Sequence, residues 1–182
     1  MSDKLTTVLA HTVLAFSSGY SLSNTEFGFS TIGLSLYFAT GVMGAVIYGL
    51  EMRDRHLLRV YQDIWSASYM CGFPLIALAY NMKYDMWPMP ALMAAPLFFE
   101  AYLILRGDML DAKLIHLHHL LAGVVNIIVS MRYNLGGCFH NALYPLATII
   151  YGETPYPTTG KRSLNWLVIT SMANFLYTGI FQ

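Results

Sequence analysis

The chain has 182 residues, of which 56% are hydrophobic and 11% are charged, and its Lys and Arg balance its Asp and Glu to a formal net charge of zero. This composition predicts one polytopic membrane domain with little mass outside the bilayer. It excludes a separate soluble catalytic domain, and because no basic patch occurs, it also excludes nucleic-acid binding.

Long apolar runs alternate with short islands of charge, and most runs are long enough to cross a hydrocarbon core of ~30 Å at ~1.5 Å per residue. In chain order they are residues 5–25, 27–50, 64–82, 86–99 (extendable to 105), 114–131, 133–152 and 163–182. We predict an all-α transmembrane helix bundle of about seven spans that forms a single domain, residues 1–182. The count is six if the first run, which is rich in Ser and Thr, does not cross.

The basic residues predict how this bundle is oriented. If each run crosses once, one side collects Lys4, Arg53, Arg55, Arg59, Arg106, Lys113, Lys161 and Arg162, whereas the other collects Lys83 and Arg132. Short loops rich in Lys and Arg stay on the inner side of a membrane. We therefore expect the N-terminus on the positive side, which is the cytosol or the mitochondrial matrix.

Other residues predict local features of the runs. Pro74 indicates a kink in the third run. Trp65, Trp87 and Trp166 all fall near predicted span ends, which is typical of an aromatic belt at the membrane interface. Cys71 and Cys138 lie at different depths, so we expect no disulfide between them.

Ionisable residues inside the runs form the best candidate site. Asp63, Glu100, His116, His118 and His119 all lie roughly 5–9 Å inside the positive side, at ~1.5 Å per residue. Glu153 ends the sixth run at the same side. Because such groups are costly in hydrocarbon, their convergence from four helices predicts one polar layer. Arg106 and Arg132 complete this lipid-binding or polar set, Arg132 as a headgroup anchor at the outer turn.

Helical phase divides the three histidines. His116 and His119 share a face, whereas His118 points about 160° away from one of them. A His–Glu pair in this layer could carry protons, and the alternative is that the histidines bond to Ser, Tyr or backbone groups. The six histidines of the chain are too few for the histidine boxes of membrane di-iron oxygenases, so we predict no metal. A bound phospholipid is the expected ligand, with no cofactor.

Three segments resemble the TLC domain family, and in particular its branch outside the ceramide synthases. They are His-His-Leu-Leu-Ala-Gly at 118–123, Gly-Glu-Thr-Pro at 152–155 and Phe-Phe-Glu-Ala-Tyr at 98–102. The resemblance covers about residues 61–182 and implies a lipid-handling bundle of seven or eight helices. Ceramide synthases of this family follow the His-His pair with His-Asp and a further Asp. Here residues 140–144 read His-Asn-Ala-Leu-Tyr, and both aspartates are missing.

Two functions follow as expectations. The missing aspartates and the minimal loops favour a non-catalytic, lipid-binding accessory subunit of a larger membrane assembly, for example a respiratory complex of the mitochondrial inner membrane. Its partners would be membrane lipids and other membrane chains. The alternative is a lipid-metabolism enzyme of acyl-transfer type, with His118 or His119 as general base and Glu153 or Glu100 orienting it. The mitochondrial inner membrane and the endoplasmic reticulum or Golgi membrane both remain open as locations.

Overall fold

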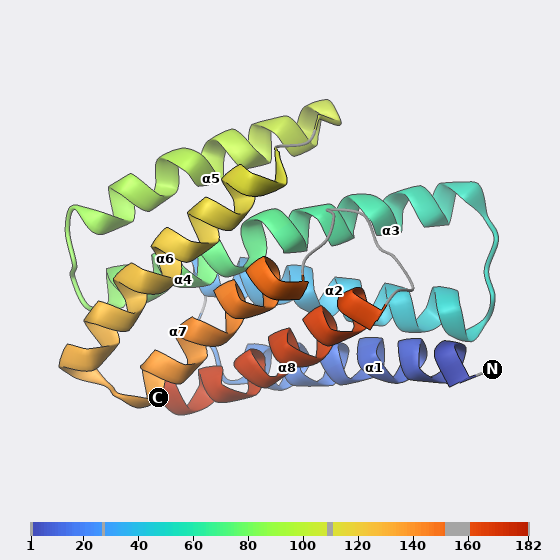
Figure 1. Ribbon diagram of the computed structural model, residues 1–182, viewed down its shortest axis with the longest axis horizontal. Helices are drawn as coiled ribbons and strands as arrows, with labels where there is room; N and C mark the ends of the chain where they lie inside the picture. Colours follow the sequence, from blue (N-terminus) through green and yellow to red (C-terminus); the bar gives the residue numbers. More distant parts are fainter. Residues whose placement is uncertain (1, 27, 109–110, 152–160, 182) are drawn as a thin grey trace.

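The computed structural model describes residues 2–26, 28–108, 111–151 and 161–181, and these ranges are all-α without strands (Figure 1). The predicted all-α fold class is therefore confirmed. The elements are α1 (Ser2–Ser23), α2 (Phe29–Gly49), α3 (Arg55–Ala67), η1 (Ser68–Gly72), α4 (Phe73–Lys83), α5 (Met89–Arg106), α6 (Ala112–Tyr133), α7 (Gly136–Leu146), η2 (Ala147–Tyr151) and α8 (Lys161–Phe181).

Each apolar run of the sequence corresponds to one helical rod, and the connections between the described rods alternate between the two ends of the bundle (Figure 1). The α1–α2, α4–α5 and α6–α7 connections lie at one end, with the α2–α3 and α5–α6 connections toward the other. By length and composition, α2, α5 and α6 can cross a membrane. The count of seven crossings and the side of the N-terminus remain predictions.

Two π-helical segments interrupt the rods beside prolines. The segment η1 joins α3 to α4 directly before Pro74, and η2 extends α7 just after Pro145. Proline lacks the N–H of the helical ladder and its ring clashes with the carbonyl four residues earlier. The carbonyl four residues before Pro74 belongs to Met70 inside η1, so the π-turn there accommodates the proline. The predicted disturbance at Pro74 is therefore a π-helical segment within a continuous rod. The segment η2 follows Pro145, and this mechanism does not account for it.

The third rod begins earlier than its apolar run, at Arg55 rather than residue 64. Asp54 is the reason, because its Oδ1 accepts a hydrogen bond from the backbone N of Leu57 at 2.8 Å and so caps the helix. Because the helix begins at Arg55, Trp65 lies well inside the rod and not at its end. Trp65 and Trp166 are each 2% exposed and pack with ring centres 4.9 Å apart. The aromatic-belt prediction was therefore wrong for these two residues, and it fits only Trp87, which is 74% exposed.

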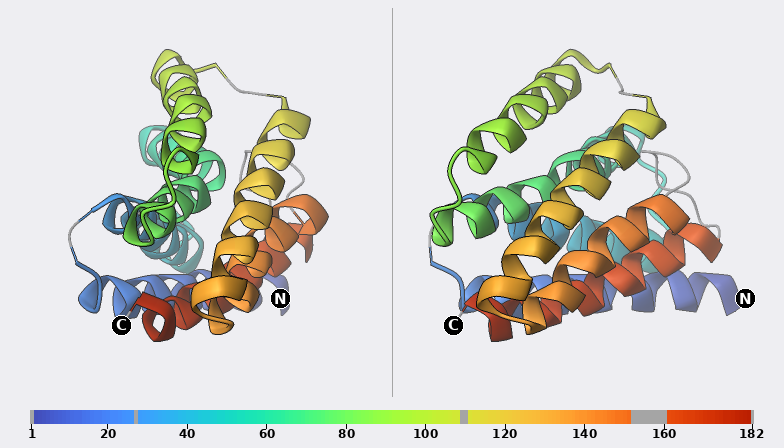
Figure 2. Two further views of the ribbon diagram at one scale, coloured as in Figure 1. Left: turned by 90° about the vertical axis from the view of Figure 1, so that its left-hand side faces the viewer. Right: turned by 60° about the vertical axis from the view of Figure 1, so that its left-hand side comes forward.

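The helices pack as neighbours in a tilted bundle (Figure 2). α1 packs mainly on α2 and α8, α7 lies between α6 and α8, and α5 lies at the margin against α4. The α1–α2 approach is close, since a Cβ added at Gly41 would lie 2.4 Å from the backbone N of Ala15. Such contacts require glycine.

A chain of buried polar side chains holds α4, α6 and α7 together. Asn81 Nδ2 donates to Asn126 Oδ1, and Asn126 Nδ2 donates to Asn141 Oδ1 at 3.0 Å. Asn141 Nδ2 donates to Ser130 Oγ at 3.1 Å, and Ser130 Oγ is 2.8 Å from the Tyr80 hydroxyl. Hydrogen bonds of this kind specify which helices pair when hydrophobic burial cannot.

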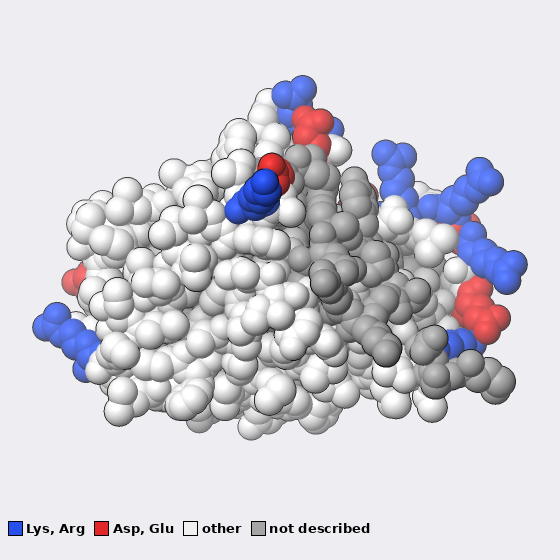
Figure 3. Space-filling model, viewed as in Figure 1, with Lys and Arg blue, Asp and Glu red and all other residues white. Residues whose placement is uncertain are grey.

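Charged side chains avoid much of the surface. On the face shown in Figure 3, most Lys, Arg, Asp and Glu lie toward the right-hand end and the top, and wide areas between carry none. Cys71 and Cys138 are both free thiols, as the sequence predicts.

Candidate functional site

The candidate site is built by the way α5 ends and α6 begins. α5 stops at Gly107, whose φ of 75° is the left-handed conformation that favours glycine as a helix C-cap. α6 starts after Asp111, whose Oδ1 accepts a hydrogen bond from the backbone N of Lys113 at 2.9 Å. Glu100 lies about two helical turns before Gly107, and His118 lies about two turns after Asp111. Because α5 and α6 run in opposite directions, these two residues face each other.

His118 and Glu100 form a buried pair. Nδ1 of His118 is 2.7 Å from Oε1 of Glu100, and the residues are 7% and 2% exposed. The other polar atoms of both side chains, Oε2 of Glu100 and Nε2 of His118, are buried and have no hydrogen-bond partner in the part of the chain that the structure describes. A buried polar group without a partner costs about 1–3 kcal/mol. The pair therefore has hydrogen-bonding capacity that the described residues leave unused.

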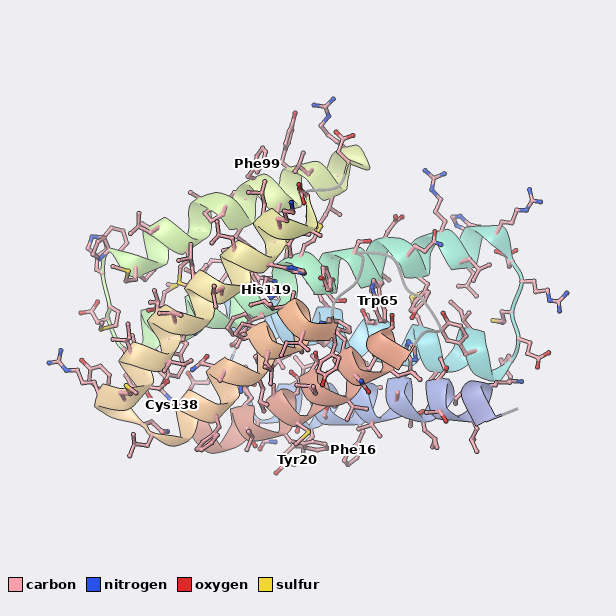
Figure 4. All side chains as sticks on the ribbon, in the orientation of Figure 1. Phe16, Tyr20, Trp65, Phe99, His119 and Cys138 are labelled. Carbon is pink, nitrogen blue, oxygen red and sulfur yellow. The ribbon has the colours of Figure 1, made fainter. Side chains whose placement is uncertain are left out.

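An apolar cleft of about 260 Å³ adjoins this pair. Glu100 and His118 line it together with Pro96 and Phe99 of α5 and three leucines of α6. The leucines are Leu114, Leu117 and Leu121, each more than half exposed. Figure 4 shows Phe99 on α5, at the edge of the bundle, and His119 near its middle. The cleft thus combines an apolar wall with two polar side chains from facing helices.

His119 and His116 contact the helix on the other side of α6. Nε2 of His119 donates to the carbonyl oxygen of Met70 at 3.2 Å, and its ring lies 6.4 Å from that of Tyr69. Nε2 of His116 is 3.1 Å from the Tyr69 hydroxyl. His116 and His119 therefore meet the same tyrosine, whereas His118 faces α5.

The remaining predicted site residues do not join this group. Asp63 is exposed on α3, one turn after Arg59. Arg106 is exposed, with its Nε 3.5 Å from Oδ2 of Asp108, and Arg132 lies over the Tyr133 ring at 5.3 Å. Glu153 lies outside the described residues. In the described part of the chain, His118 and Glu100 come together while Asp63 is exposed on α3 and does not join them, and the common depth of the polar layer stays a prediction.

The sequence offered Tyr or backbone groups as alternative partners of the histidines, and this holds for His116 and His119, but it did not identify the partners as Tyr69 and the carbonyl of Met70. Both lie in the π-helical segment η1. No spacing pattern could have found them, because they are far from the histidines along the chain and the side that η1 presents depends on its π-helical geometry. The described residues contain no cluster of three or more His, Cys, Asp or Glu suited to a metal.

Comparison of the chain with protein-family models, with curated proteins and with solved structures found no match. The resemblance to the TLC family therefore remains a prediction from the sequence.

Two kinds of chemistry fit the pair. With Nδ1 of His118 held by Glu100, Nε2 is the atom through which the imidazole can take up or donate a proton, which is the geometry of a positioned general base. Without any reaction, Nε2 and Oε2 can instead hydrogen-bond the polar part of a molecule whose apolar part lies in the cleft. The second use requires a ligand that is polar at one end and apolar along its length.

Proposed function

We propose that this chain is a polytopic membrane protein whose α5–α6 cleft binds a lipid or a similar amphiphile. The acyl chain lies against Leu114, Leu117 and Leu121, and the polar group hydrogen-bonds Glu100 and His118. The observation that carries this proposal is the pair of buried atoms without described partners, Oε2 and Nε2, beside an apolar cleft. A ligand hydroxyl or amide would supply the bonds that these atoms lack.

The membrane setting draws support from the apolar helices and from the charge distribution. α2, α5 and α6 have the length and composition of membrane spans. The connections alternate between two ends of the bundle, and most of the Lys and Arg in the sequence belong to one of these ends. This agrees with an N-terminus on the cytosolic or matrix side.

We further propose that the protein is a non-catalytic subunit of a larger membrane assembly. His140 and Asn141 occupy the stretch where the ceramide synthases of the TLC family carry His-Asp. Nδ1 of His140 donates to the carbonyl of Ala173 at 2.9 Å, and Asn141 belongs to the buried asparagine chain. Both residues are thus engaged in helix packing, which favours a binding role over acyl transfer.

Native mass spectrometry of the protein, gently extracted from its own membrane, tests both parts of this proposal. We expect a bound amphiphile on the wild-type chain and its loss from Leu117→Trp, because indole then fills the cleft. Ile128→Trp is the matched control, since Ile128 is also an exposed α6 residue and does not line the cleft. Equal lipid retention by the two variants would refute the cleft as the site.

The same spectra report the assembly. A large complex with this chain at fixed stoichiometry supports the subunit role, and its companions identify the assembly. A well-folded monomer that survives gentle extraction without companions would exclude that role, while leaving the lipid site to be judged by Leu117→Trp.

The Glu100–His118 geometry also favours a second candidate, an acyltransferase. Nε2 of His118 would accept the proton of an amine or hydroxyl as it attacks a thioester such as acyl-CoA, and the proton would pass to the departing thiolate. Such a base contributes about 10²–10⁴-fold to the rate. Acyl transfer to an added amine or alcohol in purified samples, unchanged in His118→Ala and His119→Ala, would remove this candidate.

A further inference from the structure

Two adjoining cavities lie at the end of the bundle where α1 connects to α2 and α4 connects to α5, away from the α5–α6 cleft. The first, of about 680 Å³, is bordered by the α1–α2 connection, the end of α4 and Tyr177 of α8. The second, of about 340 Å³, lies between α4 and α5. Phe29 and Met82 line both cavities, so one elongated molecule can occupy the two together. Both volumes fall in the ~300–1,000 Å³ range of ligand pockets.

The two cavities differ in chemistry. Among the residues that line the first are Glu26, Lys83 and Ser30, of which Ser30 hydrogen-bonds the Tyr177 side chain. The second is lined largely by apolar residues, including Leu78 and Phe98, and its one charged lining residue is Asp85. A path from a polar chamber with both charge signs into an apolar groove matches an amphiphile with a zwitterionic head.

Aromatic and basic residues mark this end of the bundle as the level of lipid headgroups. Trp87 lines the second cavity and is 74% exposed. The rings of Tyr84 and Tyr133 stack with centres 4.8 Å apart, Lys83 lies 6.0 Å from the first ring and Arg132 lies 5.3 Å from the second. Exposed Trp and Tyr beside Lys and Arg are typical of the boundary between hydrocarbon and water.

We propose that the two cavities bind one glycerophospholipid whose headgroup carries both a phosphate and a primary ammonium, as in phosphatidylethanolamine. Lys83 binds the phosphate, Glu26 binds the ammonium, and an acyl chain follows the groove between α4 and α5. A purely anionic headgroup places negative charge against Glu26, and a choline headgroup offers it no N–H. This site shares no lining residue with the α5–α6 cleft, so it does not depend on the function proposed for Glu100 and His118.

Lipid binding to the full-length, delipidated protein in detergent tests the proposal by native mass spectrometry. The probes are phosphatidylethanolamine, phosphatidylcholine and phosphatidylglycerol with the same acyl chains. We expect the wild type to prefer phosphatidylethanolamine by about tenfold, since one charge-assisted hydrogen bond distinguishes it from the others. Lys83→Gln should weaken its binding by about tenfold, and Glu26→Gln should abolish the preference over phosphatidylglycerol.

Arg132→Gln is the matched control, because Arg132 is the other basic residue at this end and lines neither cavity. It should bind phosphatidylethanolamine like the wild type, and so should Leu117→Trp, which blocks only the α5–α6 cleft. If Lys83→Gln and Arg132→Gln lose the same amount of phosphatidylethanolamine affinity, the lipid responds only to general surface charge and the proposed site is overturned. Equal binding of the three lipids by the wild type would overturn the assigned headgroup. If glycerophosphoethanolamine, which has no acyl chains, displaced phosphatidylethanolamine at equal concentration, the groove between α4 and α5 would not contribute to binding as proposed.

Discussion

Replacing Gly41 with alanine tests the packing of α1 against α2, which together with α8 holds the polar first helix in the bundle. A Cβ at this position would lie 2.4 Å from the backbone N of Ala15 and 2.7 Å from the carbonyl oxygen of His11. Non-bonded heavy atoms reach their best separation at about 3.5–4.0 Å, so the helices must part by roughly 1 Å. Because the obstacles are backbone atoms, no side-chain rotation relieves the clash.

The expected loss of stability follows from two opposing terms. Overpacking of this kind costs about 1–3 kcal/mol, and we take the upper half because backbone has to move. Alanine regains about 1 kcal/mol through its higher helix propensity. The net loss of about 1–2 kcal/mol corresponds to a fall in Tm of roughly 2–8 °C for a chain of this length.

Thermal unfolding in mild detergent, followed by circular dichroism, measures this difference. Gly49→Ala is the control on the same helix, because a Cβ at Gly49 meets nothing within 4 Å. It should leave Tm unchanged or raise it slightly. If Gly41→Ala and Gly49→Ala unfold at the same temperature, α1 does not pack on α2 as described and the reasoning is refuted.

Two polar contacts, Glu100–His118 in the interior and Lys4–Glu51 at the surface, can also be tested by substitution. Glu100→Leu and His118→Leu each leave one buried polar partner unpaired and should each lower the free energy of unfolding by about 2–4 kcal/mol, whereas the double variant should regain most of this loss. Chemical denaturation checks this, and a double variant as unstable as the sum of the single ones would show that the two residues are not coupled. At the surface, the hydrogen bond from Lys4 Nζ to Oε1 of Glu51, 2.6 Å long, lowers the pKa of Glu51. The stability that this contact contributes is therefore fully present above the ordinary glutamate pKa and is lost as the pH falls through the lowered pKa of Glu51. NMR titration should show that the pKa of Glu51 rises in Lys4→Gln. An unchanged pKa would exclude the contact in solution.

The helices could be located from the sequence because hydrophobic runs and charged islands report the same boundary. The exact ends of the helices could not be predicted where a single side chain determines the first helical residue. Asp54 caps α3, so the helix begins at Arg55. Trp65 therefore lies in the core and not at the membrane interface where the sequence predicted it. The two π-helical segments also escaped prediction. At Pro74 the sequence shows the proline but not how the helix accommodates it, and no residue pattern marks η2.

The candidate site was accessible to sequence reasoning in part. Helical phase separated His118 from His116 and His119, because residue spacing alone fixes which side of one helix each occupies. The pairing of His118 with Glu100 depends on where α5 and α6 are capped, which sets the register between the two helices. The contacts of His116 and His119 with Tyr69 depend on η1, a segment whose geometry no periodicity predicts.

The buried polar groups of this protein differ in how fully they are hydrogen-bonded. Within the described residues, Trp65, Asn81, His119 and His140 each keep one buried side-chain atom without a partner, as Glu100 and His118 do, but only Glu100 and His118 also line the α5–α6 cleft. Asn126, Asn141 and Ser130 bond to one another and so help to fix the helix positions. Glu100 and His118 bond to each other but bring a carboxylate oxygen and a ring nitrogen into the interior without described partners. A well-packed apolar pair would give equal or greater stability at this position. Stability therefore does not by itself account for a histidine and a glutamate here, and this agrees with the proposed binding of a polar group beside the cleft.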